Sequence, residues 1–288
     1  MKVDNAIIMA AGTSSRFAPL SYEKPKALIE VRGEILIERQ IKQQKEAGVD
    51  EIIIVTGYMS EKFQYLKDKY GVKLVHNPDY LIRNNNSSIN AVKEYLGNSY
   101  ICSSDNYFVE NPFEKEVDES YYSAVYAEGP TDEWCIKDEN GWIKDVKIGG
   151  RDSWIMLGHV FWSESFSKKF LSILEEEYYK DGTADKLWES IYIGHIDELN
   201  MKIRKYPNDF IFEFDTLDEL RLFDESYIDD TRSEILKGIK ERLGIEERDI
   251  RELKSFKDRD NSAAGFCFSV FEKKYRFFYK TEELKEEI

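Results

Sequence analysis

Residues 9–28 constrain the fold and the chemistry of this chain more than any other stretch. An apolar run over residues 6–10 enters a loop of small residues, namely Ala10, Ala11, Gly12, Thr13, Ser14 and Ser15. Small side chains let backbone N–H groups approach an anion closely. Arg16 adds a forked cationic donor, and Lys26, which follows the stiff Pro25, adds a mobile point charge. The stretch predicts a phosphate cradle that can hold a triphosphate and stabilise charge developing during a transfer.

An ordinary strand-to-helix turn with a basic rim is the structural alternative for this stretch. A plain turn needs neither Arg16 nor the run Lys24-Pro25-Lys26. We therefore prefer the phosphate cradle.

Strand-like and helix-like segments alternate over the first hundred residues. We expect strands at 6–9, 51–56, 72–76 and 99–103, and helices at 35–47, 61–69 and 87–95. This alternation predicts an α/β, Rossmann-like fold with a mostly parallel mixed sheet and right-handed crossovers. Ligands of such sheets bind beyond the carboxyl ends of the strands, where the loop at 10–16 lies.

The pattern changes after Asp105. We expect a mixed or antiparallel extension of the sheet, with strands at 121–127, 134–137, 142–147 and 154–162. After these strands we expect helices at 165–179 and 185–193, strands at 201–206 and 211–214, and a helix from Thr216. The acidic stretch 224–230 suggests a boundary, so we expect one large domain over 1–228 and a small α+β extension over 229–288.

Composition excludes several classes of function. The chain of 288 residues has 56 acidic and 41 basic residues and a net charge of −15, which disfavours binding to nucleic acid or to anionic membranes. The three cysteines show neither metal spacing nor a paired framework, which suits a reducing cytoplasm. The chain opens directly into a strand without a basic leader, so we expect a cytoplasmic protein.

The N-terminal stretch resembles the signature of the sugar-nucleotidyltransferase superfamily, Ala-Ala-Gly-x-Gly-x-Arg-x-x-Pro-Leu followed by Pro-Lys. The matching residues are Ala10, Ala11, Gly12, Arg16, Pro19, Leu20, Pro25 and Lys26. Ser14 replaces the second glycine of the family, which stiffens the loop slightly. The resemblance implies nucleotidyl transfer, with Arg16 and Lys26 as the catalytic cations.

Two aspartates are candidate metal ligands. Mg²⁺ prefers oxygen ligands and keeps several waters, so one or two carboxylates suffice. Asp105 follows the apolar segment 100–102, and Asp215 follows the segment 211–214 just before a helix. The resemblance implies that these two aspartates jointly bind the catalytic Mg²⁺. Taken alone, each fits a structural role equally well, Asp105 in a turn and Asp215 as a helix cap.

Beyond the signature, the chain resembles the bacterial CTP:phosphocholine cytidylyltransferases from residue 1 to about residue 228. The matching segments are Ile54-Val55-Thr56-Gly57-Tyr58, Tyr80 followed by Asn84-Asn85 and Ser88, Asp105-Asn106-Tyr107, Glu133-Trp134, Trp188, and Glu213-x-Asp215. The resemblance implies CTP as donor and places Tyr80, Asn84 and Ser88 near its base and ribose. Capping of a helix that starts near Ser87 is the alternative for Asn84 and Ser88.

The acceptor pocket follows from the chemistry of a quaternary ammonium, which has no N–H and is recognised by aromatic faces beside a carboxylate. Glu133-Trp134 and Trp188-Glu189 provide two tryptophans, each next to an acid. In the resembled enzymes a pocket of this kind holds choline, although Leu187 and Glu189 stand here in place of the tyrosine and aspartate of the family. Both tryptophans also fit an ordinary core.

The predicted reaction is transfer of CMP from CTP to phosphocholine, giving CDP-choline and pyrophosphate. The acceptor phosphate, already anionic at neutral pH, attacks the α-phosphorus in line, so no general base is required. Phosphoethanolamine or 2-aminoethylphosphonate as acceptor, or a sugar 1-phosphate, are the alternatives within the class. An alternative from a different class is a non-catalytic CTP-sensing module. The sequence is also compatible with a homo-oligomer.

The stretch 229–288 resembles the opening of a choline kinase-like domain, in which a helix precedes a phosphate-covering hairpin. We expect a helix at 233–243 and a hairpin formed by 265–270 and 275–279. The glycine-bearing loop of the kinase is replaced by 260–264, so we predict no kinase activity. This stretch has four alternative roles: a vestige, a docking or oligomerisation element, a truncated domain or a small packing appendage. We favour the small packing appendage.

Overall fold

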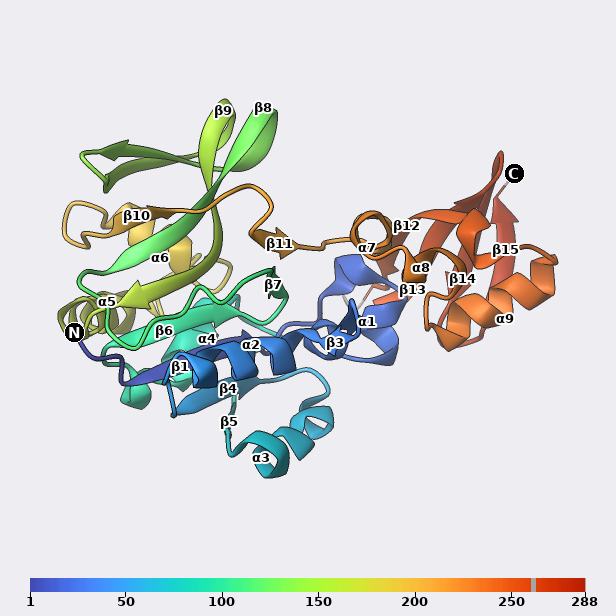
Figure 1. Cartoon of the computed structure of the whole chain (residues 1–288). Coiled ribbons are helices and arrows are strands. Elements are labelled where there is room, and N and C mark those ends of the chain that lie inside the picture. The colour runs from blue at the N-terminus through green and yellow to red at the C-terminus, as the bar shows by residue number, and fades with distance from the viewer. Residues whose placement is uncertain (260–262, 288) are drawn as a thin grey trace. The chain divides into compact units, whose positions relative to one another are not determined.

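A computed structural model describes residues 1–259 and 263–287 of the chain (Figure 1). The chain folds as two compact units. The first unit comprises Met1–Gly12 and Leu36–Glu213, and the second comprises Thr13–Ile35 and Phe214–Ile288. This division follows compactness alone, so the predicted domain boundary near residue 228 stays a prediction.

A mixed sheet forms the centre of the first unit (Figure 1). Its strands, in spatial order, are β10 (Lys202–Lys205), β8 (Tyr121–Glu139), β9 (Trp142–Trp162), β6 (Ser99–Ser103), β1 (Asn5–Ala10), β4 (Ile52–Thr56) and β5 (Lys73–His76). The run from β6 to β5 is parallel, and β9 joins it antiparallel to β6. The predicted α/β fold with a mostly parallel mixed sheet is confirmed.

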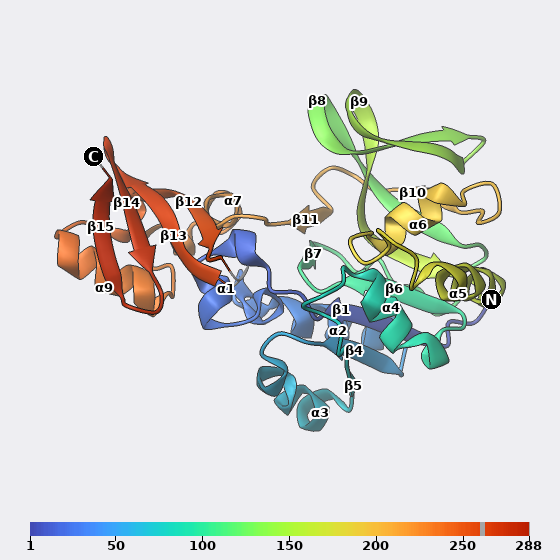
Figure 2. The same cartoon turned by 180° about the vertical axis from the view of Figure 1, so that it is seen from behind.

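Helices cover both faces of this sheet (Figures 1 and 2). They are α2 (Leu36–Glu46) on one face, and α4 (Asn86–Ala91), α5 (Glu164–Glu177) and α6 (Trp188–Gly194) on the other, with α3 (Tyr65–Tyr70) after β4. Alternate strand residues such as Ile7, Ile53 and Ile101 join the core beneath α4, α5 and α6. The apolar run Ile52–Val55 is buried on both faces, as a central parallel strand requires.

Between residues 121 and 162 we expected four strands, but the structure has two, β8 and β9, which form a long twisted hairpin (Figure 1). The prediction of separate strands was wrong because the residues between the predicted segments continue the two strands instead of ending them. Gly129 and Gly149 adopt positive φ values of 73° and 80°, and the ladder shifts register between Ala127 and Pro130. Such bulges bend a strand without ending it.

The second unit begins with short elements between Thr13 and Ile35. They are η1 (Ser15–Phe17), α1 (Leu20–Glu23), η2 (Lys26–Leu28), β2 (Glu30–Val31) and β3 (Glu34–Ile35). Its C-terminal part has α7 (Leu217–Phe223), α8 (Ser226–Asp229), α9 (Glu234–Leu243), η5 (Glu247–Asp249), β12 (Ile250–Lys257), β13 (Ala263–Val270), β14 (Lys273–Phe278) and β15 (Glu283–Glu287). The four strands form an antiparallel sheet in chain order.

Helix α9 lies beside the four-stranded sheet in both views (Figures 1 and 2). Ser233 caps its start, accepting from the N–H of Leu236 at 3.1 Å, and Gly244 ends it in the left-handed conformation. The helix predicted at 233–243 and the hairpin of β13 and β14 are confirmed.

The kinase resemblance of this part stays a prediction, since residues 260–262 of the expected loop lie outside the described residues. Among the helices that the structure describes, none is both long enough and apolar enough to span a membrane.

Candidate active site

The phosphate loop starts at the carboxyl end of β1 in the first unit. Ala10 and Ala11 are buried, whereas Gly12 is exposed. The carbonyl of Ala11 accepts a hydrogen bond from the N–H of Tyr58 at 3.0 Å, which ties the loop to the end of β4. The sheet therefore presents the loop at the edge where ligands of parallel sheets bind.

Gly57 explains how Tyr80 comes close to this loop. A Cβ at Gly57 would stand 2.6 Å from Cγ of Tyr80 and 2.7 Å from the carbonyl oxygen of Ala11. Only glycine fits between the ring and the loop. The predicted nucleotide-binding residue Tyr80 thus lies against the same strand end as Ala11.

The loop continues in the second unit with Thr13 and Ser14. Ser14 has φ 47° and ψ 42°, in the left-handed region that favours glycine, and its carbonyl accepts from the N–H of Phe17 at 2.9 Å. This conformation gives a physical reason for the glycine of the resembled signature at this position.

Arg16, Lys26 and Asp215 come together in the second unit. Nη1 of Arg16 lies 2.7 Å from Oδ2 of Asp215, and Nζ of Lys26 lies 4.0 Å from Oδ1. Arg16 is 74% exposed and Lys26 only 5%. The structure thus places both predicted catalytic cations at one predicted metal ligand.

Asp215 is held by the helix that follows it. Its N–H donates to Oε2 of Glu219 at 2.7 Å, while Thr216 caps α7 by accepting from the N–H of Glu219 at 3.2 Å. Thr216 is therefore the cap of α7, and the carboxylate of Asp215, for which a cap was the structural alternative, faces Arg16 instead.

Asp105 lies in the first unit, half-buried in the turn between β6 and β7 (Asn106–Phe108). Gln40 of α2, which is 1% exposed, donates from one Nε2 to the carbonyls of Ser103 and Asn106, both at 2.9 Å. These two carbonyls bracket Asp105, so Gln40 fixes the turn. Sequence reasoning missed Gln40, whose only signal was a polar residue on the buried face of a helix.

Within the first unit, the strand that follows Asp105 forms a short ladder with a strand from the end of the unit. Strand β11 (Ile211–Glu213) pairs antiparallel with β7, and Glu213 stands opposite Asn106. Nδ2 of Asn106 also donates to Oε2 of Glu213 at 3.2 Å. Asp105 directly precedes Asn106, and Asp215 follows Glu213 by two residues.

The donor chemistry of these aspartates fits Mg²⁺. Each offers carboxylate oxygens, and the side chain of Asp215 is 36% exposed. Within the described residues no group of three or more His, Cys, Asp or Glu side chains gathers as a metal cage. Two carboxylates with waters suit Mg²⁺, which seldom uses an all-protein cage.

The two other predicted nucleotide-binding residues both make internal contacts. Nδ2 of Asn84 donates to the carbonyl of Asp185 at 3.1 Å. Ser88 is 4% exposed, and its Oγ accepts from Nδ2 of Asn77 at 3.2 Å. Neither side chain caps α4. A nucleotide contact by Asn84 or Ser88 stays a prediction.

Glu189 forms a polar cluster with Asn85 and Tyr122. Nδ2 of Asn85 donates to Oε2 of Glu189 at 3.0 Å, and Oδ1 of Asn85 accepts from the N–H of Trp188 at 2.7 Å. Burial raises the pKa of Glu189 to about 7, although hydrogen bonds from Asn85 and Tyr122 favour its ionised form. A carboxylate in this setting is stabilised by a cation. Asn85 had no assigned role in the sequence analysis, where its signal was the polar pair Asn84-Asn85.

The two predicted pocket tryptophans differ in burial. Trp188 is 1% exposed and contacts Tyr122, Trp162 and Phe170 with ring centroids 5.1–6.0 Å apart. Its ring therefore belongs to the core. Trp134 is half-buried on β8, and the neighbouring Glu133 is exposed. Contact of these residues with substrate stays a prediction.

Several known proteins are similar to this chain. Residues 6–122 match the MobA-like NTP transferase domain. The choline-phosphate cytidylyltransferase of Streptococcus pneumoniae is 36% identical over 221 residues, which cover 76% of this chain and 96% of that enzyme. The 2-aminoethylphosphonate cytidylyltransferase of Lancefieldella rimae is 36% identical over 229 residues, covering 78% of this chain and 93% of that enzyme.

A solved structure shows the same fold. The CTP:phosphocholine cytidylyltransferase from Streptococcus pneumoniae superimposes with a TM-score of 0.75 at 36% identity, covering 78% of this chain and 99% of that one. The prediction that this protein is an enzyme, a nucleotidyltransferase, is thereby confirmed. The chain belongs to the nucleotidyltransferase family that includes the choline-phosphate and 2-aminoethylphosphonate cytidylyltransferases.

Proposed function

We propose that this protein transfers CMP from CTP to phosphocholine and releases pyrophosphate. The meeting of Arg16, Lys26 and Asp215 in one unit carries the proposal, because it places two cations beside one carboxylate. The relatedness to choline-phosphate cytidylyltransferase supports the choice of base and acceptor.

In the proposed reaction, an oxygen of the acceptor phosphate bonds to the α-phosphorus of CTP. The bond to the bridging oxygen breaks, and pyrophosphate leaves with the electron pair. Arg16 and Lys26 hold the phosphates and stabilise the charge that develops on them. The small residues of the loop allow the nucleotide to approach the backbone. No proton has to be removed from the attacking oxygen.

Asp105 and Asp215 would hold Mg²⁺, which when bound neutralises phosphate charge and orients the reacting groups. In the structure Asp215 pairs with Arg16. We infer that Arg16 exchanges this carboxylate for a phosphate when substrate binds, since guanidinium binds both anions by the same fork.

The carboxylate of Glu189 would attract the amine of the acceptor. Because burial disfavours its charge, a cationic group bound nearby would stabilise the ionised form. Trp134 would supply an aromatic face for a quaternary ammonium.

A second candidate acceptor is 2-aminoethylphosphonate. Two observations favour it, namely the equal identity to the Lancefieldella rimae enzyme and the enclosed ring of Trp188. A primary ammonium donates hydrogen bonds and depends less on aromatic faces than a quaternary one.

Pyrophosphate release with CTP and Mg²⁺ tests the proposal. The acceptors are phosphocholine, phosphoethanolamine, 2-aminoethylphosphonate and glucose 1-phosphate, and we expect the highest kcat/KM with phosphocholine. A higher value with 2-aminoethylphosphonate would select the second candidate. Turnover with none of the four would overturn the proposed reaction.

The same assay separates an enzyme from a nucleotide sensor. For an enzyme, Lys26→Met lowers turnover by about 10² to 10³ because it removes charge stabilisation in the transition state. CTP binding to the wild type without pyrophosphate release would favour a sensor.

A further inference from the structure

The C-terminal part of the second unit contacts the segment that carries Arg16 and Lys26. The most direct contact is a ring stack between Tyr22 of α1 and Tyr279, which follows β14. The ring centroids lie 3.7 Å apart and the planes differ by 1°. Tyr22 stands between Arg16 and Lys26 in the sequence, so the stack restrains the segment that joins the two cations.

A second contact joins the end of α1 to the start of α9. Oε1 of Glu23 accepts from the N–H of Ile235 at 3.0 Å. That N–H is among the donors that a helix leaves unpaired at its start. In addition, β12 lies against η1, which contains Arg16. The segment 15–23 is thus held by α9, by β12 and by Tyr279.

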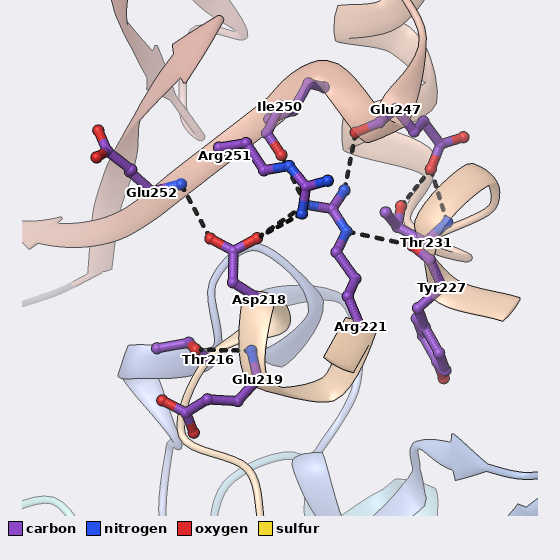
Figure 3. Close-up of polar contacts among 10 residues, drawn as sticks. All are labelled: Thr216, Asp218, Glu219, Arg221, Tyr227, Thr231, Glu247, Ile250, Arg251 and Glu252. Carbon is purple, nitrogen blue, oxygen red and sulfur yellow. Dashed lines mark hydrogen bonds and ion pairs between the residues drawn. The ribbon is translucent and has the colours of Figure 1, made fainter. Parts of the chain in front are cut away.

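The other side of the predicted site is tied to β12 through a buried arginine (Figure 3). Arg221 of α7 is 2% exposed. It donates to the carbonyls of Tyr227, Glu247 and Ile250 at 3.2, 2.8 and 2.6 Å, and to Oδ1 of Asp218 at 3.0 Å. A buried guanidinium is tolerated only when it is paired and satisfied in this way.

Asp218 completes the tie between α7 and β12 (Figure 3). Its Oδ2 accepts from the N–H of Glu252 at 3.0 Å. Asp218 lies in the first turn of α7, the same turn in which Glu219 accepts from the N–H of Asp215. The position of the Asp215 backbone therefore depends on contacts between α7 and β12.

We propose that the described residues of the C-terminal extension, 229–259 and 263–287, form a brace that positions the phosphate-binding cations and Asp215 relative to one another. In this role Tyr22, Tyr279, Arg221 and Asp218 are positioning residues, which act through the side chains they hold in place. The inference rests on the proposed function and replaces the expectation of a small packing appendage. It attributes to the extension a contribution to turnover that a mere appendage would not make.

The physical reason is the demand for accurate placement. Transfer between two bound phosphates depends on alignment, and a displacement of about 1 Å can cost about a hundredfold in rate. Arg16 is largely exposed and sits on a short 3-10 turn, which has little intrinsic stability. Restraints from elsewhere in the unit must therefore define where this side chain lies.

Paired variants of the full chain test the brace. Tyr22→Leu removes the stack, whereas Tyr22→Phe keeps the ring. Asp218→Ala cuts the tie to Glu252 and removes the carboxylate partner of Arg221, so it releases both of these contacts of Asp218. Asp229→Ala serves as its control, because Asp229 pairs with Arg248 within the same extension. Tyr22 is 40% exposed and Asp218 36%, so both sites accept substitution better than the buried Arg221.

Hydrogen exchange and steady-state kinetics are the two measurements. We expect Tyr22→Leu to speed exchange over 13–28, and Asp218→Ala to speed it over 214–219. Both variants should lower kcat/KM for CTP by about tenfold to a hundredfold, with the KM of the acceptor unchanged. Tyr22→Phe and Asp229→Ala should match the wild type in both measurements.

A purely structural role predicts a different result, in which Tm falls but the folded variants keep wild-type kcat/KM and wild-type exchange at 13–28 and 214–219. That result would overturn the proposal of a brace. Failure of the proposed function gives a different result, because the wild type would then show no turnover. The exchange measurement would still test whether the brace exists.

Discussion

Asp215 forms an ion pair with Arg16 across 2.7 Å, although the two residues come from distant parts of the sequence. Lys26 approaches the other oxygen of the same carboxylate at 4.0 Å. An ion pair this exposed contributes only about 0 to 1 kcal/mol to stability. Its main consequence is to fix three charged groups near one point, where the proposed chemistry needs them.

Arg16→Ala should separate catalysis from stability. We expect the free energy of unfolding to change by less than about 1 kcal/mol, because the pair is exposed. Turnover should fall by about 10² to 10³, because the guanidinium stabilises charge in the transition state. Urea unfolding and pyrophosphate release measure the two effects. Lys93→Ala, which breaks an exposed pair with Glu175, is the matched control and should change neither. Wild-type turnover in Arg16→Ala would remove Arg16 from the proposed mechanism.

Glu189→Gln should alter how stability depends on pH. Burial raises the pKa of Glu189 from 4.5 to about 7, so between these values the folded state holds a proton that the unfolded state has released. The contribution of this group to stability is therefore present at low pH and is lost as pH rises toward 8. The variant lacks this loss. We expect the Tm of Glu189→Gln relative to wild type to increase from pH 5.5 to pH 8. Parallel Tm curves across this range would show that Glu189 does not titrate as described.

Ser14 offers a test of backbone conformation. A left-handed non-glycine residue costs about 1 to 2 kcal/mol, which glycine avoids at the expense of greater freedom when unfolded. Ser14→Gly should therefore leave Tm equal to or slightly above that of the wild type. Ser14→Val should lower it, since a β-branched side chain tolerates this region poorly. Differential scanning calorimetry of the two variants decides, and equal Tm values for glycine and valine would argue against the left-handed turn.

Gly57→Ala should disturb the contact between the phosphate loop and Tyr80. The added Cβ would meet the Tyr80 ring at 2.6 Å and the carbonyl of Ala11 at 2.7 Å. Overpacking of this kind costs about 1 to 3 kcal/mol. Gly194→Ala is the control, because its Cβ meets no atom within 4 Å and its φ is not positive. We expect a lower Tm and a higher KM for CTP in Gly57→Ala only, and an unchanged Tm would show that the ring moves without cost.

Local patterns in the sequence predicted the parallel part of the sheet well. The strand over 52–56 is apolar from Ile52 to Val55, and the strand over 99–103 ends two residues before Asp105, so both carried strong signals. The hairpin of β8 and β9 was divided wrongly into four strands, because a glycine such as Gly129 or Gly149 is compatible with a bulge inside a strand as well as with a turn that ends one. Which of the two forms depends on pairing with the partner strand.

The sequence by itself determined the alternation that makes the sheet parallel and the loop of small residues that follows its first strand. These follow from neighbours along the chain, whose spacing sets helix or strand periodicity and the ends of elements. Only the tertiary structure decided that residues 13–35 fold with residues 214–288, that Trp188 lies in the core and that Gln40 clasps the turn of Asp105. Each of these three features depends on which segments, distant in sequence, pack together. Such packing produces no periodic pattern in the local sequence from which it could be predicted.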